Sequence, residues 1–161
     1  MVHFIRMTKL DHTDKRLLEI LQSTAHNSST AISEALNLSL SQVGRRRQRL
    51  EAEGYIIGTA CKVSAAKIGL SVQAFIQVQT GAHDAETHSA IKTLIESQSE
   101  ITAAWTMTGD ADYLFRVFCE DLPALNRLIQ DVLLPHPSIG RVHSQIVMDQ
   151  LKADGALPIF R

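Results

Sequence analysis

Cysteine is scarce in this sequence, and its scarcity excludes disulfide-stabilised folds and zinc ribbons. Cys61 and Cys119 are the only cysteines in the 161 residues. Those architectures need several cysteines at short, regular spacing. Both residues fall in segments with strand-like patterning, so we expect two buried free thiols.

Long apolar runs are also missing. No stretch of the sequence approaches the roughly 18 to 20 apolar residues that span a bilayer, and the N-terminal MVHFIRMTK lacks the apolar core of a signal peptide. We therefore expect a cytoplasmic protein with no membrane partner. Residues 1–7 precede any recognisable element and fit either a short arm or an upstream translation start.

Signatures of catalysis and of metal binding are absent as well. His83 and His88 are five residues apart, and His136 and His143 flank a strand-like segment, which is not the spacing of metal ligands. The sequence has no glycine-rich phosphate loop and no G-x-S-x-G motif. We expect no enzymatic activity, no catalytic residue, no metal and no cofactor.

Charge is distributed unevenly, although the formal net charge is only −1. Residues 1–67 hold ten Lys and Arg against six Asp and Glu, whereas residues 68–161 hold six against eleven. Because DNA is a polyanion, only the first part of the chain is suited to bind it.

Residues 8–56 carry the start and stop signals of three helices and are predicted to form one domain. Asp11 can cap the first helix, and polar residues 26–29 can cap a short second one. Asn37 tolerates the left-handed conformation that a tight turn requires, and Gly54 ends the third helix. A short helix and a tight turn before a longer helix are typical of the helix-turn-helix.

The third helix, from about residue 40 to 52, carries the most informative spacing. Ser39 and Gln42 form a capping box, and Gln42, Arg45, Arg46 and Arg49 share one face at i, i+3, i+4 and i+7. Arginine can read guanine edges in the major groove and also neutralise phosphates. A run of arginines can equally be a solvated face, but the helix order and the charge asymmetry favour DNA recognition.

The second half alternates between strand and helix patterns, in the order strand, helix, strand, strand, helix, strand. We expect a linker strand at 57–68, a ferredoxin-like βαββαβ domain at 69–152 and a tail at 153–161, which makes the chain α+β. The predicted strands cover about 72–79, 101–107, 113–119 and 139–148. Helices on one face of a sheet that is apolar on both faces predict a dimer that buries sheet against sheet.

Three motifs resemble the Lrp/AsnC family of amino-acid-responsive regulators. They are LDHTDKRLLEILQ, LNLSLSQVGRRRQRLEAEGYIIG and TGDADYLFRV, and the resemblance extends from about Leu10 to Pro158. It implies a winged-helix DNA-binding domain, a ligand-sensing domain, dimers that associate into octamers, and promoter control by amino acids. Its partners would be double-stranded DNA and an amino-acid effector.

The resemblance also implies a set of DNA-contacting residues on the third helix. Together with the cap residue Ser39, these are Ser41, Gln42, Arg45, Arg46 and Arg49. Arg47 departs from the family pattern because it stands where an apolar residue is usual. Operator sequence is therefore not transferable from the family.

For the effector, the resemblance implies the hairpin loop and two further segments. The loop residues are Thr108, Gly109, Asp110, Asp112 and Tyr113, and the further positions are Leu122, Gln145, Ile146 and Val147. Asp110 or Asp112 could accept the ammonium of an amino acid, and glycine leaves backbone N–H groups accessible to its carboxylate. The same residues also favour turns, so hairpin geometry alone could explain them.

Three classes of function remain open at this stage. An effector-responsive regulator predicts a discrete operator and a change of affinity or assembly with ligand. An architectural DNA-binding protein predicts salt-sensitive binding without a ligand response. An enzyme is the least favoured class, because no converging acid, base or metal site is visible.

Overall fold

The computed structural model describes residues 10–23 and 28–159 of the chain. Residues 1–9, which include the unexplained start, and the predicted capping positions His26 and Asn27 lie outside the described residues. The chain divides into two compact units. One holds the described residues up to Cys61 together with those from Lys152 onward, and the other spans Lys62–Leu151. In the ranges described, no helix has both the length and the apolarity to cross a membrane.

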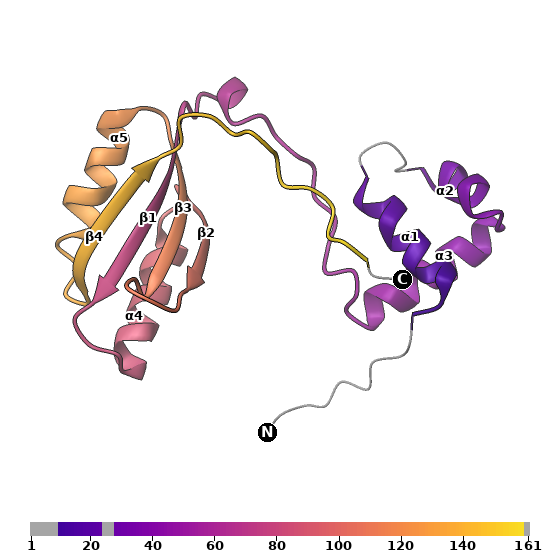
Figure 1. The fold of residues 1–161 in the computed structure, drawn as a ribbon, viewed down its shortest axis with the longest axis horizontal. Helices are drawn as coiled ribbons and strands as arrows, with labels where there is room; N and C mark the ends of the chain where they lie inside the picture. The colour runs from indigo at the N-terminus through magenta and orange to yellow at the C-terminus, as the bar shows by residue number, and fades with distance from the viewer. Residues whose placement is uncertain (1–9, 24–27, 160–161) are drawn as a thin grey trace. The chain divides into compact units, whose positions relative to one another are not determined.

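Three helices form the first unit: α1 (His12–Gln22), α2 (Ser29–Leu36) and α3 (Leu40–Ala52) (Figure 1). The expected caps are confirmed at all three, and at α2 the hydroxyl of Ser28 accepts from the N–H of Ala31. Asp11 and Asp14 form a reciprocal capping box at α1, and Ser39 and Gln42 form another at α3. Each box satisfies two backbone N–H groups that the first turn of a helix leaves without partners.

The turn between α2 and α3 depends on Asn37, which adopts φ 52° and ψ 47°. The N–H of Leu38 donates to the carbonyl of Ser33 over 3.0 Å, which closes the turn. Leu38 packs on a small core made by residues from all three helices, namely Leu17, Ile20, Ile32, Val43 and Leu50. Val43 and Leu50 therefore fix which face of α3 remains outside.

The predicted linker strand is wrong as a paired element. Among the described residues between α3 and β1, the only helix or strand is the 3₁₀ turn η1 (Ala66–Ile68). A strand needs a neighbour to complete its hydrogen bonds, and none lies beside this segment in a ladder. The expectation of a buried thiol fails at Cys61 for the same reason, since Cys61 is exposed, whereas Cys119 in the sheet is buried.

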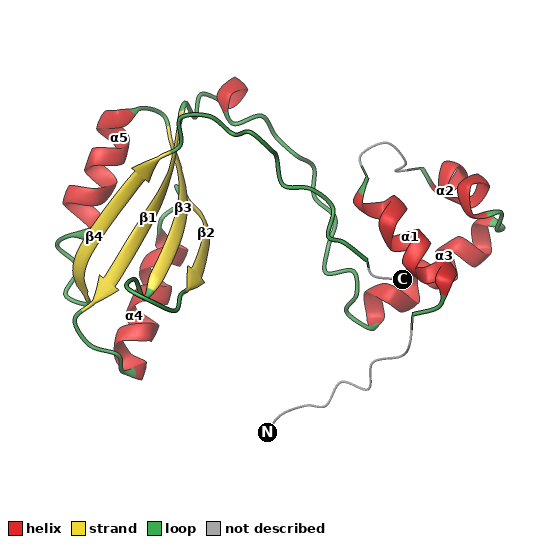
Figure 2. Cartoon of the chain, in the orientation of Figure 1, coloured by secondary structure: helices red, strands yellow, loops and turns green. Residues whose placement is uncertain are grey.

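The second unit has the predicted βαββαβ order. Its elements are β1 (Val72–Thr80), α4 (Ala85–Ser97), β2 (Ile101–Thr106), β3 (Tyr113–Cys119), α5 (Leu122–Arg127) with the π-helical continuation η2 (Leu128–Leu133), and β4 (Ile139–Ile146). The strands form one antiparallel sheet in the order β2-β3-β1-β4. Figure 2 shows α4 and α5 on one side of this sheet.

The two faces of the sheet differ in character. Ala74, Ile76 and Val78 of β1 and Phe115 and Val117 of β3 are fully buried beneath the helices. The opposite face, which we call the open face, carries half-buried Phe75, Leu114 and Phe118 among polar residues. A mixed face of this kind is suited both to a subunit contact and to a polar ligand site.

Candidate DNA-binding helix and candidate ligand pocket

The face of α3 that points away from the core forms a continuous exposed stripe. Ser41, Gly44, Arg45 and Gln48 are exposed and lie at i, i+3, i+4 and i+7. No atom lies within 4 Å of the position that a Cβ would take at Gly44. The stripe therefore offers one cation, one amide and one hydroxyl beside a patch of bare backbone.

Arg46 and Arg49, which sequence reasoning placed on the DNA-reading face, are held by α1. Nη1 of Arg46 lies 2.7 Å from Oδ1 of Asp14 and 2.7 Å from Oδ2 of Asp11, and Arg49 also pairs with Asp14. The side chain of Asp14 is only 1% exposed. A buried carboxylate requires such cations, so both arginines have a structural role whatever they do on DNA. Their contact with DNA stays a prediction.

The ion pair between Arg46 and Asp11 is accompanied by a shift in the pKa of each partner. The pKa of Arg46 is raised by hydrogen bonds to Asp11 and Asp14. Burial opposes ionisation of Asp11, but hydrogen bonds from Arg46 and from the backbone of Asp14 outweigh it, so the pKa of Asp11 falls below its usual 3.8. The carboxylate of Asp11 is thus stabilised in the charged form.

Of the other predicted positions on α3, some cap the helix and some are exposed to solvent. Ser39 and Gln42 hold the N-terminus of the helix, and the Oγ atoms of Ser39 and Ser41 lie 3.0 Å apart. Arg47 pairs with Glu51 over 2.9 Å and contacts the hydroxyl of Thr59. Sequence reasoning missed Gln48, although its i+7 spacing from Ser41 was a signal that could have found it.

In the second unit, the loop between β2 and β3 is a tight hairpin. Gly109 adopts φ 107°, a conformation that residues with a Cβ atom rarely adopt. The N–H of Met107 donates to the carbonyl of Asp112 over 2.8 Å, and the side chain of Gln79 donates to the carbonyl of Asp110. The loop is thereby fixed to β1.

Asp112 braces this loop. Its carboxylate accepts hydrogen bonds from the N–H of Thr80 over 2.7 Å and from the Thr80 hydroxyl over 3.0 Å, and it lies 3.5 Å from His83. The backbone hydrogen bond from Thr80 is the largest cause that lowers the pKa of Asp112. Both hydrogen bonds from Thr80 fall on Oδ2 of Asp112, whereas Oδ1 is the atom that lies near His83.

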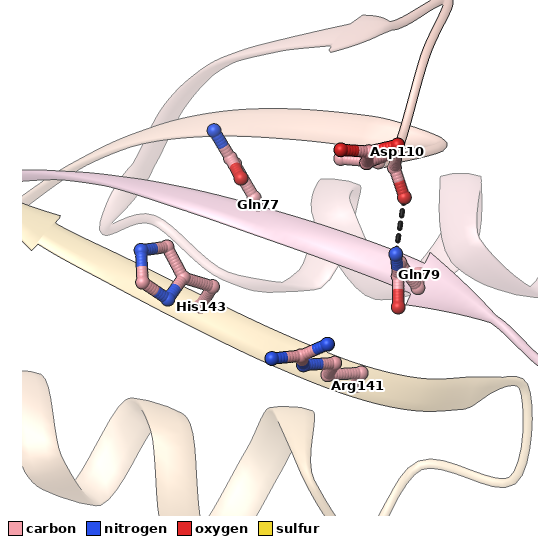
Figure 3. A pocket seen from close by; sticks show the side chains of 6 residues that line it. Gln77, Gln79, Asp110, Arg141 and His143 are labelled. Atoms are coloured by element: carbon pink, nitrogen blue, oxygen red, sulfur yellow. Dashed lines mark hydrogen bonds between the residues drawn. The ribbon is translucent and has the colours of Figure 1, made fainter.

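Asp110 instead lines a polar pocket of about 250 Å³ on the open face. Its other walls are Gln77 and Gln79 of β1, Arg141 and His143 of β4, and Ala111 (Figure 3). Gln77 faces His143 and Gln79 faces Arg141 across the two strands. The pocket thus combines a carboxylate with a guanidinium. Sequence reasoning missed the four strand residues of the pocket. A signal for them was available, since Gln77 and Gln79, like Arg141 and His143, are polar residues two positions apart, which places each pair on one face of its strand.

The remaining predicted effector residues lie elsewhere. Tyr113 faces the helices, where its hydroxyl lies 2.9 Å from Nδ1 of His88, and burial raises the pKa of Tyr113. Thr108 is exposed in the loop. Leu122, Gln145, Ile146 and Val147 lie at the other end of the sheet, because Ala74, near the start of β1, pairs with Ile146 whereas Thr80, at its end, pairs with Ile139. One chain therefore does not bring the predicted set together.

The comparisons with known proteins agree with both halves of this architecture. The profile described as winged helix-turn-helix DNA-binding matches residues 10–57, and the profile described as Lrp/AsnC ligand binding domain matches residues 73–157. The chain belongs to the Lrp/AsnC family. It is a DNA-binding transcriptional regulator with a ligand-binding domain, and the expected family, fold class and non-enzymatic function are confirmed.

Individual relatives cover nearly the whole chain. The DNA-binding transcriptional activator DecR of Escherichia coli K12 is 33% identical over 93% of this chain and 99% of its own. The leucine-responsive regulatory protein of the same strain is 25% identical over 93% and 92%. The crystal structure of the transcriptional regulator NMB0573/L-Met complex from Neisseria meningitidis has a TM-score of 0.88 at 29% identity, covering 93% of this chain and 97% of the other.

Proposed function

We propose that this regulator reads DNA with the exposed stripe of α3 and binds a free amino acid in the pocket between Asp110 and Arg141. The observation that carries the proposal is the pairing of one carboxylate and one guanidinium across a small polar pocket. A zwitterion presents an ammonium and a carboxylate at a fixed separation, and it is suited to a site with the opposite charges. The methionine complex of NMB0573 supports an amino acid as the class of ligand.

Each side chain has a role in this proposal. Asp110 accepts hydrogen bonds from the ammonium, and Arg141 binds the carboxylate, for which its planar fork of donors is suited. Gln77 and His143 lie opposite each other beside them and contact the ligand side chain. Asp112 has no direct role in this proposal, because it does not line the pocket and its Oδ2 already accepts both hydrogen bonds from Thr80.

In this proposal, the association of subunits couples ligand binding in the pocket to DNA binding. We propose that the open face forms a subunit contact in a dimer and that dimers associate into octamers. The predicted positions Leu122 and Gln145 to Val147 then meet a hairpin loop of another subunit, which would explain why they lie apart in one chain. A ligand in a pocket on the contact face must favour one assembly over another if it binds them with different affinity.

On DNA, we propose that Arg45 and Gln48 contact base edges or phosphates in the major groove. Gly44 permits close approach of the helix backbone, and Ser41 lies in the first turn of α3, where helix N-termini favour phosphates. Arg46 and Arg49 orient α3 through their ion pairs with Asp14. These ion pairs limit how far either side chain can extend toward a DNA phosphate.

The first test is a gel shift of the purified protein on DNA from upstream of its own gene and its neighbours, with and without each amino acid. We expect one amino acid to change the shift on one fragment. Equal, salt-sensitive binding to every fragment, without any ligand response, would refute the proposal and favour an architectural DNA-binding protein. Asp110→Asn is expected to abolish the ligand response and to leave ligand-free DNA binding unchanged.

A further inference from the structure

The C-terminal segment of the chain lies against the DNA-binding unit. The N–H of Leu157 donates to Oε1 of Gln22 over 2.6 Å, and Nε2 of Gln22 donates to the carbonyl of Leu157 over 3.3 Å. Gln22 is the last residue of α1, and 135 residues separate the two partners. A side-chain amide that pairs with both backbone groups of one residue imitates a strand neighbour. In Figure 1 the yellow end of the chain lies close to α1.

An apolar groove accompanies these hydrogen bonds. It has a volume of about 560 Å³ and is lined on one side by Leu18 and Leu21 of α1 and by Tyr55 and Ile56 after α3. Leu157, Pro158 and Ile159 form another wall, and Ile159 is half-buried. The same four residues of the helical side also pack on the core of the unit. The groove is therefore continuous with the core beneath the recognition helix.

We propose that Lys152–Ile159 is a latch, an extended segment that docks in this groove of its own chain and completes the DNA-binding unit. The chain crosses between the two units twice, after Cys61 and again after Leu151. The second crossing follows β4, the strand that carries Arg141 and His143 of the ligand pocket. It ends on α1, which carries the carboxylate of Asp14 that holds Arg46 and Arg49.

The docking is weak enough to be released. Within the latch the side chain of Leu157 is 77% exposed, and just before it Leu151 is 92% and Met148 100% exposed. The latch is therefore held mainly by the Gln22 hydrogen bonds and by Ile159. Because few groups hold it, a strain transmitted along β4 can undock it, which would alter the support of α1 without unfolding the sheet.

Amide exchange of Leu157, measured by NMR on the full-length protein, tests the latch. We expect Gln22→Ala to speed exchange of this amide by about tenfold, because the side-chain oxygen that accepts its proton is lost. Gln130→Ala removes an exposed glutamine of the other unit and should leave the rate unchanged. Ile159→Asp should also speed exchange, whereas the matched change Leu151→Asp should not. Equal rates in the wild type and in Gln22→Ala would overturn the proposal.

Mixed dimers decide whether the latch belongs to its own chain. Chains that carry Gln22→Ala and a full tail are isotope-labelled and combined with chains that end at Ala156 and keep Gln22. Neither chain can then dock its own tail by these hydrogen bonds, so the labelled Leu157 amide should exchange freely. Restored protection would show that the tail docks on the other subunit and would overturn docking within one chain.

Discussion

The carboxylate of Asp14 on α1 lies 2.7 Å from the guanidinium of Arg46 on α3, and the same carboxylate also pairs with Arg49. Asp14 further belongs to the capping box that begins α1. One buried acid therefore fixes both the start of the first helix and the orientation of the recognition helix. We therefore expect loss of this contact to affect DNA binding indirectly, through the fold, whereas loss of the exposed Arg45 should affect it directly.

Arg46→Ala is expected to destabilise the DNA-binding unit by about 2 kcal/mol, because it leaves a buried carboxylate with one cation instead of two. Arg45→Ala should change stability by less than about 0.5 kcal/mol, since surface substitutions seldom do more. Hydrogen exchange of α1 and α3 amides measures the difference. If both variants exchange like the wild type, the ion pair does not support the fold. Arg45→Ala should still weaken DNA binding and reduce its salt dependence by about one phosphate contact.

Gly44→Ala is expected to raise the stability of the protein and to weaken its binding to DNA. Alanine should stabilise α3 by roughly 1 kcal/mol, because glycine is a poor residue in a helix interior and the Cβ would meet open space. The same Cβ would stand between the helix and the DNA. We expect a more stable protein with weaker operator binding, measured by thermal unfolding and gel shift. Unchanged operator affinity would place the DNA on another face of α3.

Acid should destabilise both units. The pKa of Asp11, of Asp84 at the start of α4 and of Asp112 is lowered in the folded chain from the usual 3.8. A group with a lowered folded pKa contributes stability that is present above its unfolded pKa and is lost as the pH falls through the folded value. The urea concentration at the unfolding midpoint should therefore decrease as the pH is lowered below about 4. Asp11→Asn should flatten this dependence for the DNA-binding unit.

Asp110→Asn and Asp112→Asn form a matched pair. Both remove one charge from the same hairpin, but only Asp110 lines the pocket, whereas Asp112 accepts from Thr80. We expect Asp110→Asn to lose ligand binding without loss of stability. Asp112→Asn should cost about 1 kcal/mol of stability, because a charge-assisted hydrogen bond becomes a neutral one. Calorimetric titration and thermal unfolding provide the two readouts, and the reverse pattern would exchange the assigned roles.

Local signals in the sequence predicted most of the fold. The capping boxes at Asp11 and Ser39, the left-handed Asn37 and the alternation of β1 all depend on neighbours within a few residues, and each is found in the structure. The linker strand failed because a ladder depends on a partner that periodicity does not report.

The site was harder to predict because its contacts are distant in sequence. The helical spacing placed Arg46 on the outside, but the pairing with Asp14 depends on how α1 packs against α3. Arg141 and Asp110 likewise meet only through the register of β1 with its two neighbours and the loop. Turn chemistry could identify the hairpin but not which of its two acids faces the pocket.

The two crossings of the chain make the ligand-binding unit an insertion within the DNA-binding unit, rather than a module appended to it. Replacing the ligand-binding unit by that of another regulator then requires two junctions in the chain, one near Cys61 and one near Leu151. A chimera that keeps only the first junction would lack the segment that contacts Gln22. A transfer of the sensor alone must therefore join the two chains at both places.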